Sequence, residues 1–146
     1  MIRIEVDDGG HVGVPTAWIQ QGIRAACQRL GAAEGEFSVA LLDDRAIALL
    51  NREHLGHEGP TDVISFALYQ SGEPVLGDVY LGFEQAVRQA EEEGVALAEE
   101  LLRLAIHGAL HVLGLDHPQA AEEREASPMY RLQEALLAGV LGSEGG

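Results

Sequence analysis

Three histidines in the second half of the chain have the spacing of ligands for a single metal ion. His107 and His111 are four residues apart, which places both imidazoles on the same face of a helix. His117 follows six residues later and would lie about 240° around a continuous helix, on the wrong face. Gly114 stands between them, and glycine is the residue with which chains commonly leave a helix in a left-handed turn. The backbone can therefore bring His117 to the same ion.

Three imidazoles around one open position are typical of a catalytic zinc site. Neutral imidazoles leave the ion its full charge, so that it can acidify a bound water and polarise a phosphoryl or carbonyl oxygen. Hydrolysis is the expected reaction, with the metal-bound water as nucleophile and no catalytic side chain identified. One Zn²⁺ is the expected cofactor, although Ni²⁺ and Co²⁺ also suit three histidines. A structural role in the core is the competing interpretation of these residues.

The residues around the histidines distinguish between peptides and phosphodiesters as substrates. Metzincin proteases share the spacing His-x-x-x-His-x-x-Gly-x-x-His, but they carry a glutamate directly after the first histidine as general base. Gly108 occupies that position here, which argues against a protease. Asp116 precedes the third histidine and has three interpretations: a hydrogen-bond partner of a ligating imidazole, a group acting on the bound water, or a residue stabilising the loop.

The elements that must position these residues follow from apolar periodicity. Strands are predicted at residues 2–6, 37–42, 63–66 and 76–81, where β-branched and apolar residues cluster. Helices are predicted at residues 15–30, after Asp43, at 84–93, at 97–113 and at 121–141, the last with a weak point at Pro128. The short turn at 70–75 predicts an antiparallel strand pair, and the strands joined through helices can be parallel. We expect an α+β fold in which about five helices pack on a mixed four-stranded sheet, with the metal site on a central helix and the following turn.

Composition predicts one globular domain over residues 1–146 with no membrane-spanning segment. The first residues lack the apolar run of a signal peptide. The single cysteine, Cys27, lies in a helical pattern and is interpreted as buried, and a reducing cytoplasm is the expected location. The net charge of −15 argues against a broad electrostatic surface for nucleic acid but leaves room for a metal that meets a phosphate. A monomer is expected.

Several segments together resemble the YbeY family of bacterial proteins. The histidine segment, residues 107–117, is similar to the signature of that family. Residues 60–66 resemble its Pro-Thr-Asp-Val-Leu-Ser-Phe segment, and residues 76–79 resemble its Leu-Gly-Asp-Ile segment. Met129 with residues 132–134 resembles its C-terminal helix. The likeness keeps a consistent order from about residue 38 to residue 137.

The resemblance implies a metal-dependent, single-strand-specific endoribonuclease. Members of the family take part in rRNA maturation, notably at the 3′ end of small-subunit rRNA, and in ribosome quality control. By this likeness His107, His111 and His117 are the zinc ligands, and single-stranded rRNA and the small ribosomal subunit are the partners. A mixed four-stranded sheet with surrounding helices is implied as well.

The chain departs from the family in the loop before Pro60. The family has Tyr-Arg-Gly-Lys-Asp, and its arginine is expected to line the cleft; Leu55 takes that place here. Arg52, one helical turn earlier, and His57, in place of the lysine, are the candidates for contacting substrate, with a solvated surface arginine as the alternative. Ala67 replaces a family proline.

Three functions are compatible with these observations. The first is a zinc-dependent endoribonuclease acting in rRNA processing. The second is a non-catalytic ribosome assembly factor in which the metal holds helix and loop together. The third is a metallohydrolase of a peptide or a small phosphoester, whose peptide version Gly108 disfavours.

Overall fold

Four strands and five helices form the part of the chain that the structure, a computed structural model, describes, namely residues 1–116 and 127–145. The strands are β1 (Ile2–Asp7), β2 (Gly35–Leu42), β3 (Val63–Ala67) and β4 (Val75–Gly82). The helices are α1 (Thr16–Arg29), α2 (Asp44–Leu55), α3 (Phe83–Glu93), α4 (Leu97–Val112) and α6 (Pro128–Gly145). The predicted α+β fold with a four-stranded sheet and about five helices is confirmed.

The sheet has the strand order β1-β2-β4-β3. The pairs β1–β2 and β2–β4 are parallel, as expected for strands that are joined through helices. The pair β3–β4 is antiparallel, as the short connection between these strands predicted. β3 is therefore an edge strand, and all the parallel pairing lies on the other side of β4.

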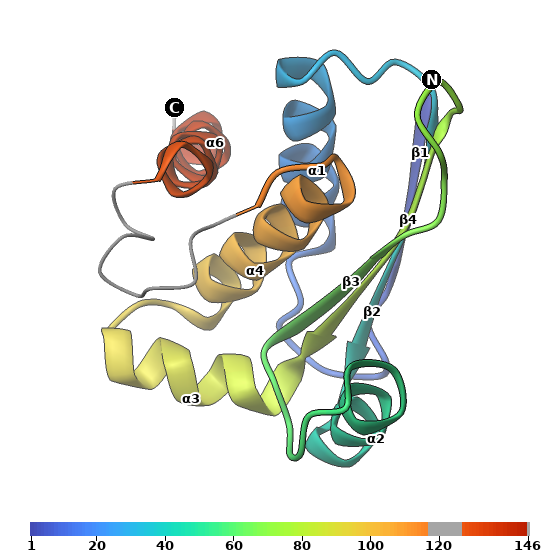
Figure 1. Cartoon of the computed structure of the whole chain (residues 1–146). Coiled ribbons are helices and arrows are strands. Elements are labelled where there is room, and N and C mark those ends of the chain that lie inside the picture. Colours follow the sequence, from blue (N-terminus) through green and yellow to red (C-terminus); the bar gives the residue numbers. More distant parts are fainter. Residues whose placement is uncertain (117–126, 146) are drawn as a thin grey trace.

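Helix α4 occupies the centre of the molecule, between the sheet and α6, with α1 alongside (Figure 1). One side of α4 packs in the core cluster that includes the sheet, through Leu101, Leu104, Ala105, Ala109 and Val112. Another side packs in a second cluster with α6, through Leu102, Ile106 and Leu110. Because α4 is buried on these two sides, only a narrow stripe of its surface remains for polar residues.

The ends of α2 and α4 are fixed by local hydrogen bonds. Asp43 caps α2, because its Oδ1 accepts a hydrogen bond of 2.8 Å from the Ala46 N–H. Gly114 has a φ of +100° and follows the C-cap of α4. Its N–H donates to the His111 carbonyl, and the Leu115 N–H donates to the Leu110 carbonyl, which is the Schellman arrangement. The turn predicted after the histidine pair is thus present.

The last helix differs from the prediction at both ends. Pro128 is its first residue rather than a weak point inside it, which suits proline because the first turn leaves N–H groups unpaired. Ser127 precedes it and accepts a hydrogen bond of 3.1 Å from the Tyr130 N–H at its Oγ. The helix continues to Gly145, beyond the predicted end at Leu141. The predicted portion at residues 121–126 lies outside the described residues.

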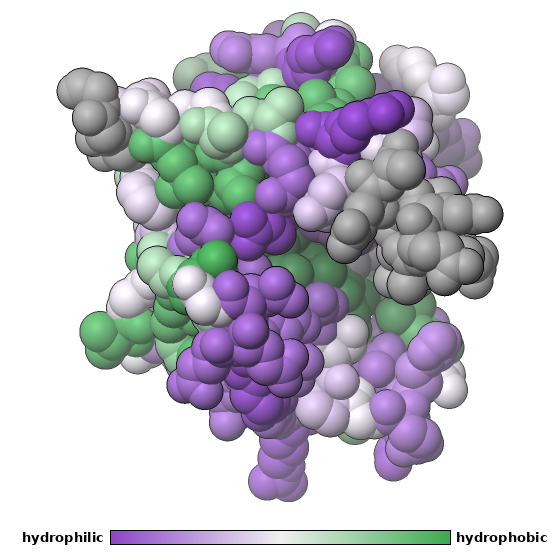
Figure 2. Space-filling model, turned by 90° about the vertical axis from the view of Figure 1, so that its left-hand side faces the viewer, coloured by the Kyte–Doolittle hydropathy of each residue, from purple (hydrophilic) through white to green (hydrophobic). Residues whose placement is uncertain are grey.

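Cys27 is 1% exposed, as its position in a helical pattern predicted. Burial raises the pKa of its thiol from 9.0 to about 11, although the positive charge of Arg24 acts in the opposite direction. None of the described helices is long and apolar enough to cross a membrane. On the face shown in Figure 2, a large hydrophilic region occupies the lower centre, and smaller hydrophobic patches lie at the left.

Candidate functional site

A stripe of four polar residues runs along the buried helix α4. Glu100, Arg103, His107 and His111 follow each other at intervals of three or four residues, so they share one face of the helix. All four line a single cavity of about 910 Å³. We call these residues the polar stripe of α4.

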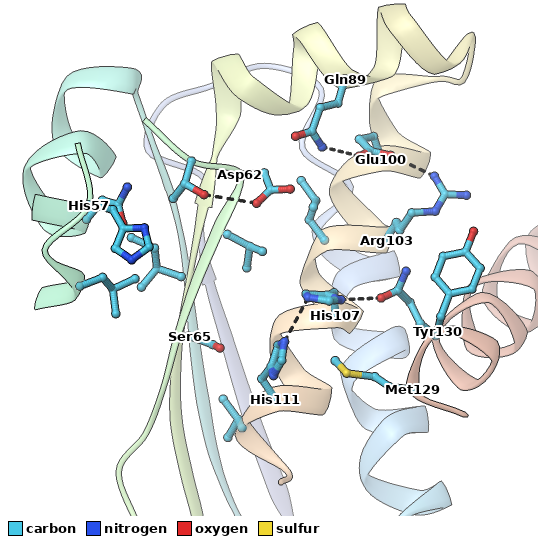
Figure 3. Close-up of a pocket in the computed structure, with 18 of the residues that line it drawn as sticks. His57, Asp62, Ser65, Gln89, Glu100, Arg103, His107, His111, Met129 and Tyr130 are labelled. Carbon is cyan, nitrogen blue, oxygen red and sulfur yellow. Dashed lines mark hydrogen bonds and ion pairs between the residues drawn. The ribbon is translucent and has the colours of Figure 1, made fainter. Parts of the chain in front are cut away.

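The cavity lies between the polar stripe, β3 with the segment before it, and the start of α6 (Figure 3). Its volume is at the upper end of the range of about 300–1,000 Å³ that is usual for small-molecule sites. The other lining residues among those described are Asn51, Leu55, His57, Thr61, Asp62, Val63, Ile64, Ser65, Ala67, Gln89, Leu104, Val112, Met129, Tyr130 and Gln133.

The imidazoles of His107 and His111 face each other in this cavity. Their Nε2 atoms are 3.1 Å apart, and the rings are inclined by 79°. Two nitrogen ligands of a tetrahedral Zn²⁺, each at 2.0–2.1 Å, would be separated by about 3.3 Å. The pair therefore already has nearly the separation that one ion requires. Among residues 1–116 and 127–145 no third metal-binding side chain completes the group, and His117, the third predicted ligand, lies outside the described residues.

Gln133 of α6 determines which nitrogen of His107 is available. The Gln133 Nε2 donates a hydrogen bond of 3.1 Å to the Oε2 of Glu134, so the amide oxygen is directed away from that carboxylate. This oxygen lies 2.7 Å from the His107 Nδ1, which must carry the proton and donate it. The Nε2 of His107 then presents its lone pair toward His111, as a metal ligand does.

Arg103, one turn before His107, is surrounded by three carboxylates. It donates to Glu99 at 3.1 Å, to Glu100 at 3.0 Å and to both oxygens of Glu134 at 3.0 and 3.2 Å. Glu100 is 5% exposed and also accepts a hydrogen bond of 2.8 Å from Gln89. Burial acts to lower the pKa of Arg103, but the hydrogen bonds that Arg103 donates to Glu134 and Glu100 outweigh this effect and raise that pKa above its usual value. The guanidinium is thus engaged inside the protein.

Gly108 provides the close approach between α4 and the sheet. A Cβ atom at this position would lie 2.7 Å from the Val79 Cγ1 and 3.1 Å from the Val63 Cγ2. Both neighbours are branched side chains of the sheet, so even a methyl group would force the helix away from it. The glutamate of a metzincin protease does not fit at this position.

Comparison with known proteins identifies the family. The family model described as Endoribonuclease YbeY matches residues 12–140. The chain belongs to the YbeY family. It is 48% identical over 130 residues to endoribonuclease YbeY of Moorella thermoacetica, with 81% of each chain covered. It is 40% identical over 133 residues to endoribonuclease YbeY of Bacillus licheniformis, with 83% of this chain and 82% of the relative covered.

A solved structure supports the fold. The solution structure of TM1509 from Thermotoga maritima superimposes with a TM-score of 0.64 and 25% sequence identity, covering 98% of this chain and 91% of that one. The resemblance to the YbeY family stated from the sequence is confirmed, and with it membership of an endoribonuclease family.

The cavity of this YbeY-family chain contains one of the two residues predicted to contact substrate. His57 lines it, and so does Leu55, whose side chain is 49% exposed. Arg52 is exposed on α2 and is not part of the lining. The position where the family resemblance places an arginine is therefore an apolar part of the cavity wall, and Arg52 does not replace it there.

Asp116 lies next to the second predicted ligand. Its Oδ1 is 3.7 Å from the Nδ1 of His111, which is beyond hydrogen-bonding distance, and its side chain is 94% exposed. The Nδ1 side of His111 thus faces a carboxylate while its Nε2 side faces His107. A supporting role of Asp116 for the His111 ring stays a prediction.

Two contributors to the site were missed from the sequence. Arg103 had a local signal, because a charged residue in a helix that is otherwise apolar on most sides requires partners. Gln133 had none: its contact with His107 joins residues 26 positions apart and depends on how α6 packs against α4.

Proposed function

We propose that the protein is a zinc-dependent endoribonuclease that cleaves single-stranded RNA in the cytoplasm. Its proposed role is the maturation of the 3′ end of small-subunit rRNA and ribosome quality control, with the small ribosomal subunit as partner. The observation that carries the proposal is the His107–His111 pair, whose Nε2 atoms lie 3.1 Å apart in a cavity of a YbeY-family chain.

In this proposal His107, His111 and His117 hold the ion. Zinc, when bound there, supplies a Lewis acid that polarises a phosphoryl oxygen and lowers the pKa of water. Gln133 keeps the proton of His107 on Nδ1 and so keeps Nε2 directed at the ion. Glu134 orients the Gln133 amide and is itself held by Arg103. Asp116 is proposed to support His111 from the opposite side of its ring.

The remaining walls of the cavity receive the RNA. His57 is proposed to contact the substrate inside the cavity, opposite the polar stripe (Figure 3). Arg52, exposed on α2 outside the lining, is proposed to meet a phosphate of the chain where it leaves the cavity. A single basic contact of this kind contributes affinity without sequence preference.

A second candidate is a metal-containing assembly factor that binds the ribosome without cleaving RNA. Leu55 favours it, because an apolar side chain lines the cavity where the family resemblance places an arginine. The net charge of −15 favours it too, since it weakens binding of a polyanion.

The test is cleavage of a single-stranded rRNA fragment and of its duplex by the purified protein, with and without a chelator. His111→Ala is the test variant, and His11→Ala, which removes an imidazole stacked on Phe83 away from the cavity, is the matched control. We expect cleavage of the single strand only, abolished by the chelator and by His111→Ala but retained by His11→Ala. Elemental analysis should find one zinc ion per chain in the active protein.

Two results would contradict the proposal in different ways. Equal cleavage by His111→Ala would show a contaminating nuclease or a misassigned site. Absence of cleavage by the zinc-loaded protein, together with rescue of rRNA processing in cells by His111→Ala, would favour the assembly factor.

A further inference from the structure

The outer edge of β3 has no partner strand among the described residues. β3 ends the strand order β1-β2-β4-β3, and β4 takes up its inner edge. The same strand forms one wall of the cavity that contains His107 and His111. The backbone groups at this open edge are therefore next to the cavity.

Two hydrogen bonds that flank β3 determine which of its backbone groups point to the open edge. The Gly82 N–H donates to the Asp62 carbonyl at 2.8 Å, and the Leu68 N–H donates to the Leu76 carbonyl at 2.7 Å. Both pairs follow the same antiparallel register as the strand pairs between them. In such a ladder, residues that bond to the partner strand alternate with residues that do not. Positions 62, 64, 66 and 68 therefore direct their N–H and C=O groups at β4.

The alternate residues direct these groups to the open edge. They are Val63, Ser65 and Ala67, and all three line the cavity. We call their outward N–H and C=O groups the β3 ledge. Val63 and Ser65 are partly exposed and Ala67 is exposed, whereas Ile64, between the first two, is 3% exposed. Successive members are separated by about 6.8 Å, twice the rise per residue of an antiparallel strand.

The charges around the ledge favour a neutral partner group. Asp62 and Glu100 line the same cavity. Arg103 is the only arginine that lines it among the described residues, and it is already paired with three carboxylates. Away from the proposed metal site, a phosphate placed against this wall would be repelled by these carboxylates. A nucleobase edge carries no charge and offers donors and acceptors side by side, as each residue of the ledge does.

We propose that the β3 ledge binds the base edges of single-stranded RNA, next to the His107–His111 pair. The inference rests on the proposed function and adds to it the element that selects unpaired bases. In a duplex these edges are occupied by the complementary strand, so a ledge of backbone groups cannot reach them. Figure 3 shows Ser65 projecting from β3 toward His111, which places the ledge beside the proposed reaction centre.

An extended peptide could also pair with such an edge. The packing of Gly108 against Val79 and Val63 disfavours cleavage of such a peptide, because the position leaves no room for the general base of a metzincin protease. A peptide is therefore included as a competing ligand in the test.

The first measurement is amide hydrogen exchange by NMR on the zinc-loaded protein. The ligand is a single-stranded 2′-O-methyl phosphorothioate oligonucleotide, which resists cleavage, and its duplex and an extended peptide are the comparisons. We expect the single strand to slow exchange at Val63 and Ser65 by about tenfold or more, the effect of one added hydrogen bond. Ile64 and Phe66, already bonded to β4, should change little.

The second measurement uses a backbone substitution. Ser65→Pro removes the outward N–H and, on an edge strand, spares the ladder to β4. Ser65→Ala keeps the N–H and serves as the reference for loss of the hydroxyl. We expect Ser65→Pro to bind the oligonucleotide about tenfold more weakly than Ser65→Ala, with equal zinc affinity in both.

The outcomes separate the two proposals when cleavage of unmodified RNA is measured in parallel. In one outcome the wild type cleaves RNA, but the ledge amides are not protected and both Ser65 variants bind the oligonucleotide equally. The proposed role of the ledge is then wrong, while the proposed ribonuclease function is retained. If the wild type neither binds nor cleaves single strands, the proposed function fails and the ledge fails with it. Protection by the peptide but not by RNA also overturns the ledge. If Ser65→Pro does not fold, the hydrogen-exchange measurement on the wild type tests the ledge by itself.

Discussion

The polar stripe of α4 contains two regions whose polar side chains find their partners in different ways. Arg103 and His107 are one helical turn apart and line the same cavity. The charge of Arg103 is satisfied within the protein by Glu99, Glu100 and Glu134. His107 has one nitrogen bound to Gln133 and the other directed at His111, 3.1 Å away.

One mostly buried helix can therefore carry both a structural and a reactive polar group. A buried guanidinium is stable only when its donors are paired, and the carboxylates around Arg103 provide this pairing. The two imidazoles instead direct their Nε2 atoms at each other. The two regions meet on α6, where Glu134 binds Arg103 and its neighbour Gln133 binds His107. Stability and chemistry should therefore respond to different substitutions.

The largest effect on chemistry is expected from His111→Ala. It removes one of the two converging Nε2 atoms, so binding of one zinc ion per chain should be lost in titrations followed by calorimetry. The free energy of unfolding of the metal-free protein should change by about 1 kcal/mol or less, because His111 is partly exposed and its imidazole is not a core side chain. A large loss of stability without metal would show that the imidazole is a core residue instead.

The opposite pattern is expected from Arg103→Leu. The variant leaves three carboxylates around an apolar side chain, and the buried Glu100 would lose its only cationic partner among the described residues. Removing one partner of a buried ion pair costs about 3–5 kcal/mol. Because the Arg103 side chain is 22% exposed, we expect a loss at the lower end of that range, which urea denaturation measures. Arg103→Lys is the control, since it retains the charge but not the two-pronged contact with Glu134, and it should cost less. Equal stability of wild type and Arg103→Leu would contradict the structural role assigned to this residue.

The sequence predicted the elements well because apolar periodicity and local end signals are short-range properties. The strand pattern at residues 63–66 and the turn after it were enough to orient β3 against β4. The Asp43 cap and the Gly114 turn were visible for the same reason. The start of α6 at Pro128 was misplaced, because the prediction treated this proline as a weak point inside a helix, although proline suits the first turn.

The site was predictable only where its spacing is local. His107 and His111 are one turn apart on one helix, so their convergence follows from helical geometry. Gln133 and Glu134 reach the polar stripe from α6, about thirty positions later in the chain, and no periodicity reports such a contact. Arg52 was selected as one turn from Leu55, but the direction of its side chain depends on how α2 packs, and the structure leaves it outside the cavity lining.

A smaller effect, confined to the metal, is expected from Gln133→Leu. The variant removes the acceptor of the His107 Nδ1 proton while keeping Glu134 on Arg103. Loss of such a supporting hydrogen bond typically lowers metal affinity by about 10–100-fold. Competition with a chelator of known affinity measures the change, and Gln85→Leu on α3, which does not line the cavity, is the matched control. If both variants hold zinc as tightly as the wild type, Gln133 does not orient His107.

The smallest effect is expected where α4 ends. Gly114 has a φ of +100°, and a Cβ there would meet no atom within 4 Å, so Gly114→Ala tests the backbone alone. The left-handed conformation costs a residue with a side chain about 1–2 kcal/mol, and the free energy of unfolding should fall by that amount. Gly139→Ala is the matched control, because its Cβ also meets nothing within 4 Å but lies inside α6, where alanine should stabilise by about 0.5–1 kcal/mol. The turn at Gly114 also directs the chain from His111 to Asp116, and His117, the third predicted ligand, is the next residue in the sequence. We therefore expect zinc affinity to fall in Gly114→Ala and to stay unchanged in Gly139→Ala. Opposite signs of the stability change with equal zinc affinity would mean that the turn ends the helix but does not position the third predicted ligand.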